Sequence, residues 1–428
     1  MGNILYNSHE DVIRMMERMI LHSDINHCYA QIEEMKYPDL RYVPMAVGGH
    51  EEDRHGIILA KNDLAKTYGL KTGETLYSAK QKCPGLLILP PNYGEYMNVT
   101  DKVKNIYQCY SDRVESYGLD EAWIDISKST ELFGSGYTIA CMIQERIKRE
   151  LGLTVSIGIS FNKIFAKMAS DMNKCSGLIE VTKENYQTLI WNLPVEDLFY
   201  VGKATKRKLN QYGVQTIGDL ASLPIGWMKD HFGKIGELLW WFSNGKDVSD
   251  VMLQNYQDPM KSIGNAITAP RDIRTFHDAK VIYYVLVESV ASRMRDAELY
   301  GNVIQITLRD CDLVWFTRQR KISSFTNLAS DIMPVVLSLL NENHNFKKPL
   351  RTIGVSVSGL INEHNHTQLN LFKSEEEQFK QRSLEDVVDN IRYKFGFDKI
   401  KRCVCLTEQD ISDFNPKADH VIHPISFF

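Results

Sequence analysis

Short segments in which apolar residues cluster or alternate with polar ones mark the strands expected in the first half of the chain. These segments are residues 19–24, 43–47, 56–60, 120–126 and 154–160. Apolar residues recur at helical spacing over residues 8–18, 28–35, 95–110 and 138–151. This order predicts a sheet backed by helices, preceded by a short helical extension.

The pattern changes after residue 185. Residues 186–251 read as helical throughout, with glycine turns at Gly202 and Gly213, and residues 252–261 are polar and weakly patterned, as in a linker. Strands are then expected at 262–269, 302–310, 313–322 and 350–358, and helices at 278–298 and 326–341. The second half therefore predicts a helical unit, a linker and a separate α+β sandwich.

Composition narrows the class of protein. The chain has 428 residues and a net charge of -4, so several packed units are expected and a wholly basic nucleic-acid coat protein is disfavoured. Its eight cysteines show no C-x-x-C spacing, and we see no secretion signal and no apolar stretch of membrane-spanning length. We expect a soluble cytoplasmic protein with no membrane partner.

Acidic residues lie at the ends of two expected strands. Asp24 ends the first strand, and Asp120 with Glu121 opens a later one directly after a turn at Gly118. Carboxylates from separate strands suit Mg²⁺, and two such cations suit in-line phosphoryl transfer. Each acid taken alone would more often be a strand cap or part of a solvated surface, so the hypothesis depends on their combination.

Candidate phosphate contacts follow the same strands. The helix after Asp24 would point the N–H groups of His27 and Cys28 at an anionic ligand. Tyr29 on that helix could face the ligand or simply be core. Lys167 and Lys174 could neutralise phosphates or be solvated, and their spacing alone does not choose.

Two groups of residues suit contact with a nucleic-acid backbone. Gly202 and Lys203 combine a glycine turn with the start of a basic helix. Arg271, Arg318 and Arg320 are basic residues of the last domain, although such charges more often form a solvated face.

Two motifs carry a resemblance to a known family. Residues 23–33 read SDINHCYAQIE and residues 118–127 read GLDEAWIDIS. With residues 158–174, 201–203 and 261–272, they make the chain resemble the Y-family DNA polymerases, most closely the branch of bacterial DNA polymerase IV. The resemblance spans residues 19–372.

The resemblance implies an α+β multidomain protein with the right-hand architecture of polymerases. Its parts would be an N-terminal extension (1–18), a palm (19–35 and 96–185), fingers (36–95), a helix-hairpin-helix thumb (186–251), a linker (252–261), a little finger (262–361) and a tail (362–428).

The resemblance also assigns the catalytic and metal-binding residues. Asp24 and Asp120 would bridge two Mg²⁺ ions, Glu121 would help to hold one of them, and the carbonyl of Ile25 would contribute to the other.

For the nucleotide, Tyr29 would be a steric gate that excludes a ribose 2′-hydroxyl, and His27, Cys28, Lys66 and Lys174 would bind the triphosphate. Lys66 stands where many members have arginine. Asp63 stands where the family usually has a phosphate-contacting tyrosine, so we expect it to pair with Lys61 or Lys66, or to face away.

The implied partners are primer-template DNA, deoxynucleoside triphosphates and a sliding clamp, and the protein would act as a monomer. The residues expected to contact DNA are Gly202, Lys203, Ser262, Arg271, Arg318 and Arg320. The peptide expected to bind the clamp is residues 368–372, with Gln368, Leu369, Leu371 and Phe372 as contacts. The alternative for its apolar side chains is packing against their own domain.

We therefore expect a template-directed, low-fidelity translesion DNA polymerase that acts in DNA damage tolerance. A non-catalytic scaffold of the same fold that binds DNA and the clamp is one alternative, and a nucleotidyl cyclase with a palm-like sheet is another.

Overall fold

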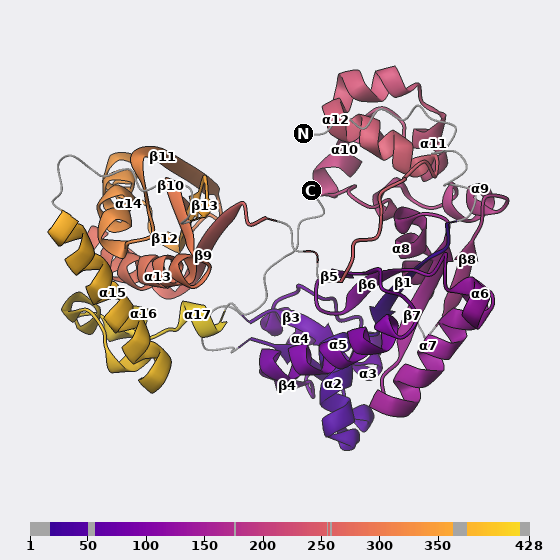
Figure 1. The fold of residues 1–428 in the computed structure, drawn as a ribbon, viewed down its shortest axis with the longest axis horizontal. Coiled ribbons are helices and arrows are strands. Elements are labelled where there is room, and N and C mark those ends of the chain that lie inside the picture. The colour runs from indigo at the N-terminus through magenta and orange to yellow at the C-terminus, as the bar shows by residue number, and fades with distance from the viewer. Residues whose placement is uncertain are drawn as a thin grey trace. The chain divides into compact units, whose positions relative to one another are not determined.

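The computed structural model describes residues 18–49, 56–174, 177–254, 256, 259–362 and 375–419. The chain divides into two compact units, and their boundary follows Tyr256, inside the segment expected to be a linker. The expected helix over 8–18 lies almost wholly outside the described residues, and the expected clamp-binding peptide lies wholly outside them. Figure 1 shows the elements of each unit.

A five-stranded sheet with the order β5-β6-β1-β7-β8 is the centre of the first unit. Its strands are β1 (Ile20–Ile25), β5 (Val114–Tyr117), β6 (Glu121–Asp125), β7 (Val155–Ser160) and β8 (Leu178–Val181). The central strand β1 is antiparallel to both β6 and β7 and is fully buried. The apolar pattern at 19–24, 120–126 and 154–160 thus forms three adjacent strands.

Helices cover both faces of this sheet. Leu21 and Ile124 pack against α5 (Tyr93–Gln108) and α7 (Gly136–Leu151) on one face. Ile20 and Trp123 pack against Ala166 of α8 (Lys163–Met172) on the other. Because side chains alternate along a strand, Asp24 lies on the same face as His22, the face covered by α8. Its cross-strand partner Glu121 lies beside it on that face.

A small second sheet with the order β3-β2-β4 has a core of its own. It contains β2 (Met45–Gly48), β3 (Ile58–Lys61) and β4 (Leu87–Leu89), and it is accompanied by η1 (Pro38–Tyr42), α3 (Asp63–Thr67) and α4 (Leu76–Lys82). The helix α2 (Cys28–Lys36) leads from β1 into this region, so the two sheets meet where β1 ends.

Residues 186–243 form a helical subdomain within the first unit, as the sequence pattern predicts. Its elements are α9 (Tyr186–Ile190), η3 (Val195–Asp197), α10 (Lys203–Gln211), α11 (Ile217–Ser222) and α12 (Ile225–Ser243). Gly233 interrupts α12 with a φ of 63°, a conformation that glycine adopts without a steric penalty.

The second unit contains a sheet with the order β11-β10-β12-β9, and a short strand β13 (Ile361–Asn362) pairs with β10. The long strands are β9 (Ser262–Ile273), β10 (Leu299–Asp310), β11 (Trp315–Thr326) and β12 (Leu350–Ser358). The helices α13 (Phe276–Asp296) and α14 (Ala329–Asn343) pack against one face of the sheet. The expected strand over 313–322 begins later, because Leu313 lies in the turn with a positive φ.

Residues 375–419 are an ordered part of the second unit, although the sequence pattern assigned them only to a tail. They form α15 (Glu375–Phe395), η5 (Phe397–Lys399), η6 (Cys403–Leu406), α16 (Gln409–Ser412) and α17 (Pro416–Asp419). Arg295 of α13 forms ion pairs with Glu385 at 2.5 Å and with Asp389 at 2.7 Å. Glu288 of the same helix forms an ion pair with Arg392 at 2.7 Å. This segment therefore docks on α13 through paired charges.

Candidate active site

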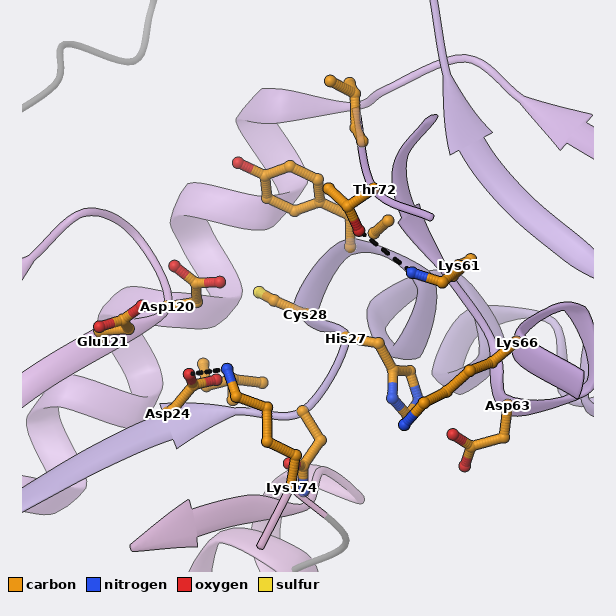
Figure 2. Close-up of a pocket in the computed structure, with 15 residues that line it drawn as sticks. Asp24, His27, Cys28, Lys61, Asp63, Lys66, Thr72, Asp120, Glu121 and Lys174 are labelled. Atoms are coloured by element: carbon orange, nitrogen blue, oxygen red, sulfur yellow. Dashed lines mark hydrogen bonds and ion pairs between the residues drawn. The ribbon is translucent and has the colours of Figure 1, made fainter. Parts of the chain in front are cut away.

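A cavity of about 510 Å³ opens at the end of β1, where the two sheets of the first unit meet (Figure 2). All of the residues expected to bind metal or nucleotide line it. The lining residues are Asp24, Ile25, Asn26, His27, Cys28, Tyr29, Leu59, Ala60, Lys61, Asp63, Lys66, Thr72, Asp120, Glu121 and Lys174.

Backbone pairing brings the acids together. The register of β1 and β6 sets Asp24 opposite Glu121, and the N–H of Ile25 donates to the carbonyl of Asp120 at 3.0 Å. The turn before Asp120 contains Gly118 with a φ of 73°, which favours glycine. This turn places Asp120 just ahead of the regular strand, as expected for neighbouring acids that reach one pocket.

Burial and neighbouring carboxylates disfavour the ionised form of two of the acids. Burial, followed by the charges of Glu121 and Asp120, raises the pKa of Asp24 to about 6, although Lys174 acts in the opposite direction. Burial and the charge of Glu121 likewise raise the pKa of Asp120. A cation bound between them would relieve both effects.

Glu121 differs from the other two acids because its Oε2 atom is already engaged. The ammonium of Lys167 contacts this oxygen, and Nε2 of His22 lies 3.2 Å from it. Burial alone would raise the pKa of Glu121, but the contacts with His22 and Lys167 outweigh burial and hold it at about 2. Within the described residues, no three histidine, cysteine, aspartate or glutamate side chains form a ready-made metal cluster.

Lys174 contacts the first acid. Its Nζ lies 3.1 Å from Oδ2 of Asp24 and 2.7 Å from Oδ1 of Asp171. Burial opposes the charge of Lys174, but the two carboxylates raise its pKa, so the side chain is a cation at the edge of the pocket. Figure 2 shows its side chain ending beside the carboxylate of Asp24.

Tyr29 is held by two other tyrosines. Its ring stacks on Tyr96 with a centroid distance of 4.6 Å and an interplanar angle of 12°, and it meets Tyr93 edge-on at 6.0 Å. The hydroxyl of Tyr96 donates to Oε1 of Glu33 at 2.7 Å. These contacts fix the plane of the Tyr29 ring.

The opposite wall of the pocket comes from the second sheet and α3. Lys61 donates to Thr72 at 3.2 Å, and Lys66 and Asp63 lie beside His27 (Figure 2). Burial lowers the pKa of His27, while the charge of Asp63 opposes this change. Neither expectation for Asp63 holds: it lines the pocket, and no ion pair in the described part of the chain joins it to a lysine.

Among the residues expected to contact DNA, Gly202 is the N-cap of α10 and Lys203 is exposed beside it. The arginines are engaged inside the second unit. Arg271 pairs with Asp278, Glu408 and Asp410 at 2.6–3.1 Å. Arg320 pairs with Glu342 at 2.6 Å, and Arg318 donates to Asn343 at 3.0 Å, both toward α14. Ser262 is exposed at the start of β9.

Two residues of the site, His22 and Tyr96, are absent from the sequence predictions, and Lys167 has a contact that they do not include. His22 could have been found, because it precedes Asp24 by two positions on a strand and so shares its face. The contact of Lys167 with Glu121 and the stacking of Tyr96 on Tyr29 have no local signal, since each joins residues far apart in the chain.

Three family models match this chain. The impB/mucB/samB family matches residues 23–171, the C-terminal domain of that family matches residues 260–371, and the thumb domain of DNA polymerase iota matches residues 196–247.

Relatives and solved structures agree with the family models. DNA polymerase IV of Acetivibrio thermocellus is 44% identical over 93% of this chain and all of its own length. DNA polymerase IV 2 of Bacillus subtilis is 37% identical over 92% of this chain and 96% of its own. A solved Y-family DNA polymerase chimera has a TM-score of 0.71 and 23% identity, and covers 81% of this chain and all of its own.

The architecture is that of a right-hand polymerase, with a helix-hairpin-helix thumb. The chain belongs to the impB/mucB/samB family, the Y-family DNA polymerases, and it is a DNA-directed DNA polymerase that acts on DNA and nucleotides. Polymerases of this family depend on metal ions. The expected family, architecture and class of enzyme are confirmed, which sets aside the scaffold and the cyclase. None of the helices described is long and apolar enough to cross a membrane.

Proposed function

We propose that the protein is a low-fidelity translesion polymerase that extends a primer opposite damaged template bases, using two Mg²⁺ ions in DNA damage tolerance. The observation that carries the proposal is one pocket lined by Asp24, Asp120, Glu121, Tyr29 and Lys174. These groups are what nucleotidyl transfer needs on a deoxynucleotide: oxygen ligands, a surface for the sugar and a cation for the phosphates.

The donor set fits Mg²⁺. Asp24, Asp120 and the carbonyl of Ile25 offer hard oxygen ligands, and the raised pKa values of the two aspartates support a site that gains by holding cations. Bound Mg²⁺ would lower the pKa of the primer 3′-hydroxyl and offset charge on the triphosphate. The protein fixes the carboxylates on β1 and at the start of β6, so that little reorganisation is needed.

The cations around the pocket suit the triphosphate. Lys174, which lies against Asp24, would be available to a phosphate oxygen when that carboxylate holds a metal ion. Lys66, His27 and Cys28 border the same cavity, so the start of α2 is available to an anionic group there. The ammonium of Lys66 is a point charge, whereas the guanidinium of an arginine can form two parallel hydrogen bonds. We therefore expect Lys66 to bind phosphate with less directional specificity.

We propose that DNA contacts two surfaces of the protein in addition to Arg271, Arg318 and Arg320. One is the turn at Gly202 and Lys203. The other is the sheet face of the second unit turned away from α13 and α14, whose cross-strand rows contain no acidic residue. The rows are Ser262-Ser358-Val303-Lys321, Gly264-Ser356-Gln305-Gln319, Ala266-Gly354-Thr307-Thr317 and Thr268-Thr352-Arg309-Trp315. Small and polar side chains of this kind allow close approach of a phosphate backbone.

We also propose that the protein acts as a monomer in the cytoplasm and binds a sliding clamp through residues 368–372. The combined variant Leu371→Ala with Phe372→Ala should lose clamp binding, measured by surface plasmon resonance, and keep primer extension without the clamp. Unchanged clamp affinity in this variant would remove the proposal for the peptide.

Primer extension by the wild-type protein tests the proposed function. A labelled primer annealed to a longer template should lengthen with deoxynucleoside triphosphates and Mg²⁺, and the product should follow the template across a lesion. Extension on undamaged template alone would confine the protein to ordinary synthesis. Failure to extend any primer would remove the proposal.

A further inference from the structure

Helix α8 places two buried lysines against the catalytic sheet. Lys163 and Lys167, one turn apart, have side chains that are only 3% and 10% exposed. Lys163 bonds to both carboxylate oxygens of Glu115 at 2.7 and 2.8 Å, whereas Lys167 bonds to Glu121. A buried ammonium is costly unless it is matched by a negative charge, so each lysine requires its partner.

Two aromatic rings surround the ammonium of Lys167 on the side of Glu121 that faces away from the cavity. Its Nζ lies 5.1 Å from the centre of the Tyr117 ring and 5.7 Å from that of Phe199. Lys167 does not line the nucleotide cavity, although Glu121 does. Lys167 therefore contacts Glu121 from outside the cavity, whereas Lys174 lines it.

A histidine ring lies close to the same carboxylate oxygen. Nδ1 of His22, which is fully buried, lies 2.7 Å from Oγ of Ser170, and that hydroxyl donates to the carbonyl of Lys167. Nε2 of His22 lies 3.2 Å from Oε2 of Glu121, the oxygen that Lys167 also contacts. In the described part of the chain, Oε1 of Glu121 has no hydrogen bond or ion pair.

We infer that Lys167 is a positioning residue for Glu121: its fixed cation holds Oε2 and restricts the carboxylate to coordinating a metal ion through Oε1 alone. This inference rests on the proposed two-metal function. Single-oxygen coordination leaves room in an octahedral shell for the primer hydroxyl and for water. The same positive charge weakens cation binding, so Lys167 exchanges metal affinity for a defined geometry.

The test compares Lys167→Met with Lys163→Met, which removes an equally buried lysine from the same helix but leaves Glu121 untouched. Mn²⁺ serves as a paramagnetic probe that accepts the same octahedral oxygen ligands as Mg²⁺. Titrated by electron paramagnetic resonance in the full-length protein without DNA, Lys167→Met should bind Mn²⁺ at least about threefold more tightly than the wild type. Lys163→Met should match the wild type.

Activity gives a second readout. Lys167→Met should lower kcat about tenfold or more, because the carboxylate is no longer held in one orientation, with little change in the KM for nucleotide. In the Glu121→Gln background, Lys167→Met should raise Mn²⁺ affinity less than it does in the wild-type background, because only the effect of its charge on Asp120 remains. Lys167→Arg keeps the charge, and should retain wild-type affinity even if Lys167→Met does not fold.

Three results would overturn the inference: an unchanged Mn²⁺ affinity in Lys167→Met, an equal change in Lys163→Met, or tighter binding in Lys167→Arg. The Mn²⁺ titration needs no polymerase activity. A wild-type protein that fails to extend primers would therefore remove the proposed function, whereas an unmoved titration would remove this inference alone.

Discussion

Asp24→Asn should abolish primer extension and, at the same time, stabilise the metal-free protein. Loss of a ligand shared by both metal ions removes several kcal/mol of transition-state stabilisation, so we expect a fall in kcat of about 10³-fold or more. Stability should change in the opposite direction, because burial and neighbouring negative charges disfavour the ionised form of Asp24.

The sign follows from the raised pKa. A carboxyl group with a folded-state pKa of about 6 is most favourable to folding below its unfolded pKa, and this contribution is lost as the pH rises through about 6. The difference from an ordinary aspartate corresponds to about 3 kcal/mol at neutral pH. Because the raised pKa already includes the opposing contact with Lys174, we expect a net gain of up to about 3 kcal/mol.

Scanning calorimetry of the wild type and Asp24→Asn, without divalent cations, measures this gain. The two proteins should unfold at similar temperatures below about pH 4 and diverge above about pH 6. Added Mg²⁺ should stabilise only the wild type. A variant less stable than the wild type at pH 7 would mean that the contact with Lys174 outweighs the desolvation of Asp24.

The strands that carry the site could be predicted because they depend on local patterns. β1 and β7 are buried along their whole length, and their clustered or alternating apolar residues mark them as strands. The turn at Gly118 explains why Asp120 and Glu121 can reach the same pocket. The family motifs then located each acid, and the cavity contains every residue expected at the metal ions and the nucleotide.

Charged partners could not be predicted, because they come from distant parts of the chain. Arg271 was expected to contact DNA, but its partners Glu408 and Asp410 lie in the C-terminal segment that docks on α13. Lys167 and Lys174 both follow strand β7 in the sequence, and their positions alone do not tell which of them reaches the pocket. Only the packing of α8 against the sheet buries one of them and leaves the other at the pocket.

The same reasoning explains Asp63. Its neighbours in sequence, Lys61 and Lys66, were the natural partners, but Lys61 turns to Thr72 and the carboxylate of Asp63 lies beside His27 instead. The approach of α2 to β3 creates this arrangement, and no local pattern encodes it.

Tyr29→Ala should remove most of the discrimination against ribonucleotides. The ring cannot tilt away from an incoming sugar, because Tyr96 stacks on one face at 4.6 Å and Tyr93 meets it edge-on. A clash with a fixed ring costs about 1–3 kcal/mol, so its removal should raise the kcat/KM for ribonucleotides relative to deoxynucleotides by roughly 10- to 100-fold. Single-nucleotide incorporation with paired deoxy and ribo substrates measures the ratio.

Two further variants separate the ring from its support. Tyr29→Phe keeps the ring and should keep the discrimination, whereas Tyr96→Leu leaves the gate without its stacking partner and should give an intermediate ratio with a larger share of the effect in KM. If Tyr29→Ala discriminates as strongly as the wild type, the 2′-hydroxyl does not approach this ring, and another part of the pocket selects the sugar.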